Sequence, residues 1–140
     1  MLFTIPGIDD YLHLSYRSDA ATLVMRWLRT VSFAEVQEGF RAARELSYSH
    51  GAARWLIDVR CRTELDPPTS GWVITTLLPA VAAESAPARL CVAYVLAPSQ
   101  THMLEQHSDM RATTATARTH PSYQLQLFQD EHEAVSWLLH

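Results

Sequence analysis

Asp58, Arg60 and Arg62 are the charged residues whose spacing most directly suggests a site. They follow the apolar run Trp55-Leu56-Ile57 at alternate positions. If this run is a strand that continues, Asp58 and Arg60 lie on one face of it. Ligands of open α/β sheets bind near such carboxyl ends of strands, so the pair could hold the polar head of a ligand. The alternative, which we favour, is a structural salt bridge that anchors the next loop.

The segment 72–83 offers apolar surface instead of charge. It is apolar on almost every side, which is typical of a helix buried on more than one face. Three interpretations are open: a core helix, a dimer contact, or a lid over an apolar pocket. The residues that would form the contact or the pocket are Trp55, Trp72, Leu78, Val81 and Tyr94, with Trp27 nearby.

The histidines and cysteines indicate neither a metal site nor a catalytic one. His102, Glu105 and His107 do not share one helical face, as the zinc-binding His-Glu-x-x-His pattern requires. Cys61 and Cys91 lack Cys-x-x-Cys spacing, and the chain has no Gly-x-Ser-x-Gly elbow or glycine-rich phosphate loop. We therefore expect no enzyme, no metal and no cofactor. An enzyme whose site residues are scattered along the chain is our third alternative.

Alternating and apolar runs predict the elements that must position these residues. Strands are expected at residues 11–16, 22–28, 54–59, 90–96 and 123–128. Helices are expected at residues 33–49, 72–83 and 99–110 and after Asp130, whereas residues 111–122 are expected to form a loop. The order β-β-α-β-α-β-α-β-α predicts a single α/β domain, a mixed β-sheet flanked by helices, over residues 11–140. Residues 1–10 are expected to form an N-terminal arm.

Local signals mark the ends of the helices. Ser32 and Glu35 have the spacing of a capping box, and Gly51 stands where the first helix should end. Asp66-Pro67 is a start signal for the second helix. Pro79 lies within that helix and predicts a kink.

Three of these segments carry a family resemblance. They are the early hairpin with its capped helix, the strand Trp55-Leu56-Ile57-Asp58-Val59-Arg60, and the closing Phe128-Gln129-Asp130-Glu131-His132-Glu133-Ala134-Val135-Ser136-Trp137-Leu138. In this order they resemble the SpoIIAA-like branch of the STAS superfamily, over most of residues 11–139. The resemblance implies a domain that is generally non-catalytic. Relatives in this branch have been thought to carry small non-polar molecules.

The same resemblance singles out Ser70. Some STAS proteins are switched by phosphorylation of a serine at the start of the helix after the third strand, and Thr69-Ser70-Gly71 opens the corresponding helix here. A phosphate on Ser70 would lie near the positive end of the helix dipole and could recruit an arginine of a partner. The alternative is that Thr69 and Ser70 are ordinary polar residues of a first helical turn.

Composition limits the partners. With 140 residues, 48% of them apolar, the chain is one domain large enough to bury its own core. Eleven basic and 15 acidic residues leave a net charge of −4, which disfavours nucleic acid as a partner. We find no secretory signal and no 18-residue apolar stretch for an integral membrane segment, so we expect a cytoplasmic protein.

These patterns together predict a non-enzymatic accessory protein, expected as a homodimer, that binds a protein partner or a small apolar ligand. Affinity would come from burial of the apolar side chains of segment 72–83, and Asp58 and Arg60 would orient the ligand. A phospho-regulated signalling antagonist switched at Ser70 is the alternative.

Overall fold

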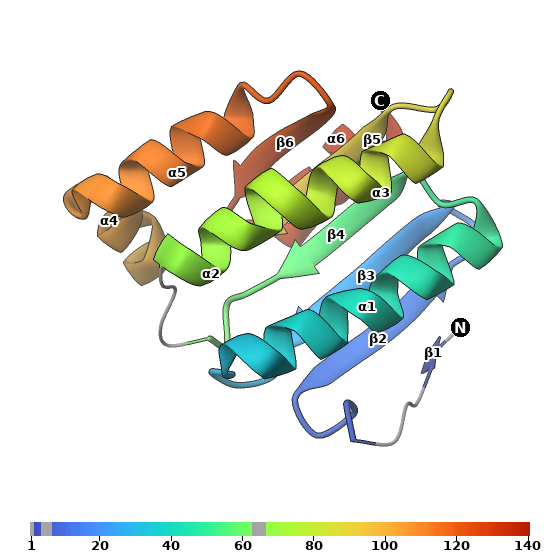
Figure 1. The fold of residues 1–140 in the computed structure, drawn as a ribbon, viewed down its shortest axis with the longest axis horizontal. Helices are drawn as coiled ribbons and strands as arrows, with labels where there is room; N and C mark the ends of the chain where they lie inside the picture. Colours follow the sequence, from blue (N-terminus) through green and yellow to red (C-terminus); the bar gives the residue numbers. More distant parts are fainter. Residues whose placement is uncertain (1, 4–6, 63–66) are drawn as a thin grey trace.

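Five alternating or apolar runs form the long strands of one mixed sheet (Figure 1). The structure, a computed structural model, describes residues 2–3, 7–62 and 67–140. The strands lie side by side in chain order: β1 (Leu2–Phe3), β2 (Leu12–Arg17), β3 (Thr22–Trp27), β4 (Arg54–Asp58), β5 (Leu90–Val95) and β6 (Tyr123–Phe128). β1, β2 and β3 are antiparallel, and β3 to β6 are parallel. The predicted α/β fold with a mixed sheet is confirmed, and β1 adds a two-residue strand within the segment expected to be an arm.

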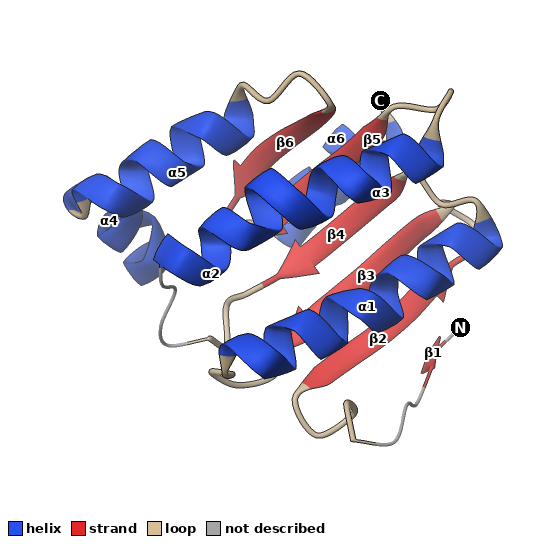
Figure 2. Ribbon diagram, viewed as in Figure 1, coloured by secondary structure: helices blue, strands red, loops and turns tan. Residues whose placement is uncertain are grey.

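The helices cover the two faces of the sheet unequally (Figure 2). One face carries α1 (Phe33–His50), α2 (Pro67–Trp72), α3 (Leu78–Ser85), α4 (Pro98–Gln106) and α5 (Ser108–Arg118), and the other carries α6 (Glu131–Leu139). Right-handed crossovers between parallel strands in sequential order place every connecting helix on the same face. The larger core lies under these helices, and α6 closes a smaller one around Val24, Leu56 and Ala134.

Three of the predicted helix ends are formed as expected. Ser32 Oγ accepts the Glu35 N–H at 3.2 Å, and the Glu35 carboxylate accepts the Ser32 N–H at 2.9 Å, which completes the capping box of α1. Gly51 ends α1 with φ of 61°, a left-handed conformation that glycine adopts without a steric penalty. Asp130 caps α6 by accepting the His132 N–H at 2.9 Å. The predicted cap at Asp66 lies outside the described residues.

The second helix contains a π-helical turn where the sequence predicts a kink. This turn, η1 (Val73–Leu77), lies between α2 and α3, and the Leu78 N–H donates to the carbonyl of Val73, five residues back. Pro79 has no N–H, and its ring would clash with the carbonyl of Thr75 in a regular α-helix. The wider turn accommodates the proline without ending the helix.

The prediction of a loop over residues 111–122 is wrong, because residues 108–118 form α5. Met110 and Ala117 lie seven residues apart on one face and are buried in the core. The hydroxyl groups of Thr113 and Thr116 donate to carbonyls four residues back at 2.9 and 3.1 Å. These bonds satisfy the threonine side chains within the helix, so they do not compete with it.

Candidate functional site

A cavity lies over the carboxyl ends of the parallel strands, on the face that carries most of the helices. Trp27, Ile57 and Tyr94 line it from the neighbouring strands β3, β4 and β5. Its walls come from α2 and η1 on one side and from α4 and α5 on the other. The cavity has a volume of about 70 Å³. Ligands of open α/β sheets bind at this end of the strands, so the cavity is the primary candidate site.

The lining of the cavity is largely apolar with a few polar groups. Val73, Leu104 and Met110 are typical of its helical walls. The polar side chains among the described lining residues are those of Trp27, Arg62, Thr69, Ser70, Tyr94, Thr113 and Thr114. An apolar lining with a small number of polar groups is the usual composition of a small-molecule site.

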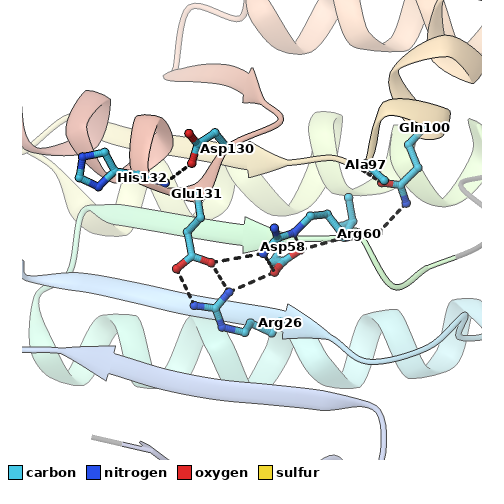
Figure 3. Close-up of polar contacts among 9 residues, drawn as sticks. Arg26, Asp58, Arg60, Ala97, Gln100, Asp130, Glu131 and His132 are labelled. Atoms are coloured by element: carbon cyan, nitrogen blue, oxygen red, sulfur yellow. Dashed lines mark hydrogen bonds and ion pairs between the residues drawn. The ribbon is translucent and has the colours of Figure 1, made fainter.

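Arg62 is held at the cavity by contacts of both its main chain and its side chain. Its guanidinium carbon lies 5.5 Å from the centroid of the Trp27 ring, within the range of a cation–π contact. The carbonyl of Arg62 accepts a hydrogen bond from Gln100 Nε2 at 2.7 Å. The same Nε2 donates to the carbonyl of Val59 at 2.6 Å. Gln100, buried in α4 (Figure 3), therefore fixes the turn after β4 that places Arg62.

Trp27 and Tyr94 present hydrogen-bond donors in the lining. Trp27 is 1% exposed, and its buried Nε1 has no hydrogen-bond partner in the part of the chain that the structure describes. Burial raises the pKa of Tyr94 to about 12, although the charge of Arg62 acts to lower it. The phenol therefore carries its proton at neutral pH. The indole N–H of Trp27 and the guanidinium of Arg62 can donate hydrogen bonds and cannot accept them.

An ion network lies on the opposite face of the sheet and joins β3, β4 and α6 (Figure 3). Arg60 Nε and Nη2 donate to the two carboxylate oxygens of Asp58 at 3.0 and 2.8 Å. Arg26, the neighbour of Asp58 in the sheet register, donates to Asp58 Oδ2 at 3.1 Å. Arg26 also contacts both carboxylate oxygens of Glu131 at the start of α6. We refer to Arg26, Asp58, Arg60 and Glu131 as the ion network.

The pKa shifts within the network favour the charged forms of both acids. Burial acts to raise the pKa of Asp58, but the hydrogen bonds from Arg60 and Arg26 hold it below its usual range. The hydrogen bond from Arg26 lowers the pKa of Glu131 and outweighs its partial burial. Two positive and two negative charges balance, so the geometry favours the structural interpretation of Asp58 and Arg60 over that of a ligand-binding pair.

The structure brings four of the residues singled out in the sequence to the cavity lining: Trp27, Arg62, Ser70 and Tyr94. Ser70 is half-buried in α2. Asp58 and Arg60 lie on the opposite face of the sheet, and of that charged group only Arg62 lines the cavity. The cavity therefore contains part of the charged group, part of the apolar group and Ser70, and the structure does not bring all members of either group together there.

The other apolar candidates lie elsewhere. Trp55 is fully buried beneath α1, and its Nε1 donates to Ser47 Oγ at 3.0 Å. Leu78 and Val81 are core residues with 0% and 2% exposure, so they are already covered by the chain itself. Trp72 is half-buried and contacts an exposed phenylalanine, Phe33, edge to face.

Gln100, Arg26 and Glu131 were missed in the sequence. Gln100 lies in a weakly helical, polar segment, and its sole signal is its place three residues after Ala97, where the carboxamide oxygen accepts the Ala97 N–H. Arg26 is the one charged residue inside an otherwise apolar strand, and a charge in such a strand calls for a partner. Glu131 has no local signal, because its partner is 105 residues away.

Within the described ranges, no group of three or more His, Cys, Asp or Glu side chains is placed to hold a metal ion. The helices in those ranges also include none that is long and apolar enough to cross a membrane.

Comparison of the chain with protein-family models, with curated proteins and with solved structures gave no match. The resemblance to the SpoIIAA-like branch therefore rests on the residues and on the order of the elements.

Proposed function

We propose that this chain is a non-enzymatic binding protein that takes up a small, largely apolar molecule in the cavity between η1, α5 and the sheet. The observation that carries the proposal is the cavity itself, with its apolar walls and its place at the carboxyl ends of β4 and β5. Transfer of an apolar ligand from water to these walls is favourable because it removes apolar surface from water.

The size of the cavity limits the ligand to a short chain or a single ring. One water molecule needs roughly 10–15 Å³ of such space. The cavity of about 70 Å³ therefore holds roughly five to seven groups of this size. Binding energy per non-hydrogen atom is bounded at about 1.5 kcal/mol, so we expect a Kd in the micromolar range or weaker.

The element order supports membership in the SpoIIAA-like branch, which we propose as the family, and the carrier role thought to hold for its relatives agrees with the cavity. We further propose that the protein is a cytoplasmic homodimer. The exposed ring of Phe33, in contact with Trp72, is apolar surface that a second copy would cover.

The test of the proposed function uses toluene and n-pentane as probes and a variant that fills the cavity. Ala117 is a buried lining residue of α5, and Ala112 is an exposed residue of the same helix. We expect both probes to shift backbone amide NMR signals around the cavity in the wild type and in Ala112→Leu, and to leave them unchanged in Ala117→Leu. Failure of both probes to bind the wild type would contradict the proposal.

Native and then denaturing mass spectrometry of freshly purified protein gives a second test of the same proposal. A small mass that is lost on denaturation would identify the class of ligand carried from the host.

A phosphorylation switch at Ser70 is the second candidate function, because Ser70 is half-buried in the cavity lining. A phosphate there would add charge beside apolar walls and would oppose uptake of an apolar ligand. Phosphopeptide mapping of protein from its native host tests this function, which requires that Ser70 be modified under some growth condition.

A further inference from the structure

Among the described residues that line the cavity, the formal charge has one sign. Arg62 supplies a positive charge, and no Asp or Glu occurs among the described residues that line the cavity. Arg62 has interactions of its own within the protein. Its charge acts to lower the pKa of Tyr94, another residue of the lining, although burial raises that pKa by more.

Two polar groups that lie against each other in the lining, the Trp27 indole and the Arg62 guanidinium, can only donate hydrogen bonds. The Trp27 indole lies against the guanidinium, and its N–H has no acceptor among the described residues. Tyr94 is half-buried in the same lining. A buried donor without an acceptor costs about 1–3 kcal/mol, so a ligand that supplies an acceptor gains more here than one that supplies a donor.

The rest of the lining is largely apolar and is complementary to the hydrocarbon part of a ligand. Leu104, Met110 and Leu125 are apolar and lie among the lining residues from α4, α5 and β6. A ligand complementary to both parts has an apolar body and a compact acceptor group. Resting on the proposed function, we infer that the cavity selects small apolar carboxylates, with the carboxylate toward Arg62, Trp27 and Tyr94 and the hydrocarbon toward the helical walls.

Ligands of one shape and different head groups test this inference. Benzoate, benzamide and benzylamine share the toluene skeleton and carry an anionic acceptor, a neutral amide and a cationic donor; the five-carbon acid, amide and amine repeat the series as chains. We expect the carboxylate to bind at least tenfold more tightly than the amine in whichever series fits, with the amide between them. Equal or tighter binding of the amine would overturn the inference.

The indole N–H signals report where the head group lies. The chain has four tryptophans, and Trp27→Phe assigns the signal of interest. We expect the Trp27 N–H signal to move downfield on saturation with the carboxylate as it gains an acceptor. The Trp55 N–H should not move, because it is already bonded to Ser47. A Trp27 signal that is unmoved at saturation would contradict the proposed placement.

Variants separate the head group from the apolar walls. Arg62→Met should weaken carboxylate binding at least tenfold and leave toluene or pentane binding within twofold. The control is Arg111→Met, which removes the same charge from an exposed position of α5 and should leave carboxylate affinity unchanged. Because Arg62→Met removes a buried side chain, Tyr94→Phe serves as the second variant, with a several-fold loss expected for the carboxylate alone.

The outcomes distinguish the two proposals. If toluene or pentane binds but the carboxylate has no advantage, the inference about the head group fails and the proposed function stands. If no probe binds the wild type, both fail.

Discussion

Arg26 in β3 and Glu131 in α6 are 105 residues apart in the chain and form a two-point ion pair, with Arg26 Nη2 and Glu131 Oε2 3.0 Å apart. Through Arg26 the pair continues to Asp58 and Arg60. It joins the last helix to the middle of the sheet at the end of the molecule where the cavity lies on the other face. The ion network therefore bears on stability, while the cavity bears on binding.

Glu131→Gln should destabilise the fold more than Glu133→Gln does. Glu131 and Glu133 both lie in the first turn of α6, so both interact with the helix dipole, but the ion network includes Glu131 and not Glu133. Glu131 is about one-third exposed, so we expect a loss of about 0.5–1 kcal/mol in the free energy of unfolding from urea denaturation. Glu133→Gln is the control and should cost less. Equal losses would mean that the pair contributes nothing beyond the dipole.

The stability of the fold should decline in acid because of Asp58. Its pKa in the folded protein is lowered by Arg60 and Arg26 in spite of burial. A lowered folded pKa stabilises the fold above the unfolded value of about 3.9, and this contribution is lost as pH falls through the folded pKa. We therefore expect Asp58→Asn to cost about 2 kcal/mol at pH 7, the scale of hydrogen bonds to a charged group, and progressively less below pH 4.

Urea denaturation at a series of pH values checks this prediction, with Asp9→Asn as the control at an exposed turn. The control should follow the wild-type profile. A difference between Asp58→Asn and the wild type that stays constant from pH 7 to pH 2 would show that the charge of Asp58 does not contribute.

Local signals and distant partners differ in how well they can be predicted from sequence. The start of α1 follows from Ser32 and Glu35, which satisfy each other within three residues. The pairing of Asp58 with Arg60 is also local and was expected. Arg26 and Glu131 contact Asp58 and Arg60 because β3 pairs with β4 in the sheet and α6 packs over both strands. No local sequence pattern predicts that arrangement.

The error over α5 has a different cause. Threonine has a low helix propensity, and the segment shows no clear apolar period. Its buried face consists of Met110 and Ala117, one of them small, and alanine and arginine are strong helix formers. Because α5 forms one wall of the cavity, the prediction of a loop there meant that the cavity could not be predicted from sequence. The predicted fold class was still correct.

Gly39→Ala and Gly71→Ala should have opposite effects, although both glycines lie in helices. A Cβ atom on Gly39 would lie 2.6 Å from Trp27 Cη2 and 3.0 Å from Leu12 Cδ2, and both of those side chains are buried. Overpacking of this kind costs about 1–3 kcal/mol. A Cβ atom on Gly71 would meet nothing within 4 Å, so alanine there should stabilise by up to about 1 kcal/mol through helix propensity.

Thermal and urea unfolding of the two variants check this pair. Because Trp27 also lines the cavity, Gly39→Ala should in addition shift the Trp27 indole N–H signal. A stabilising effect of Gly39→Ala would contradict the close approach of α1 to β3.

Gln100→Ala should affect both stability and binding, because one buried amide holds the turn that carries Arg62. Its Nε2 donates to the carbonyls of Val59 and Arg62 at 2.6 and 2.7 Å. Removal of the side chain leaves two acceptors without these donors, each loss costing about 1 kcal/mol or more, so we expect about 2 kcal/mol of destabilisation. Hydrogen exchange should accelerate at the Arg62 amide, whose N–H donates to the carbonyl of Val59 in the same turn.

Gln106→Ala, at the exposed end of α4, is the control and should change neither the free energy of unfolding nor the exchange rate of the Arg62 amide. If the Arg62 amide exchanges at the wild-type rate in Gln100→Ala, the turn is held by other contacts, and Gln100 has no part in positioning Arg62 at the cavity.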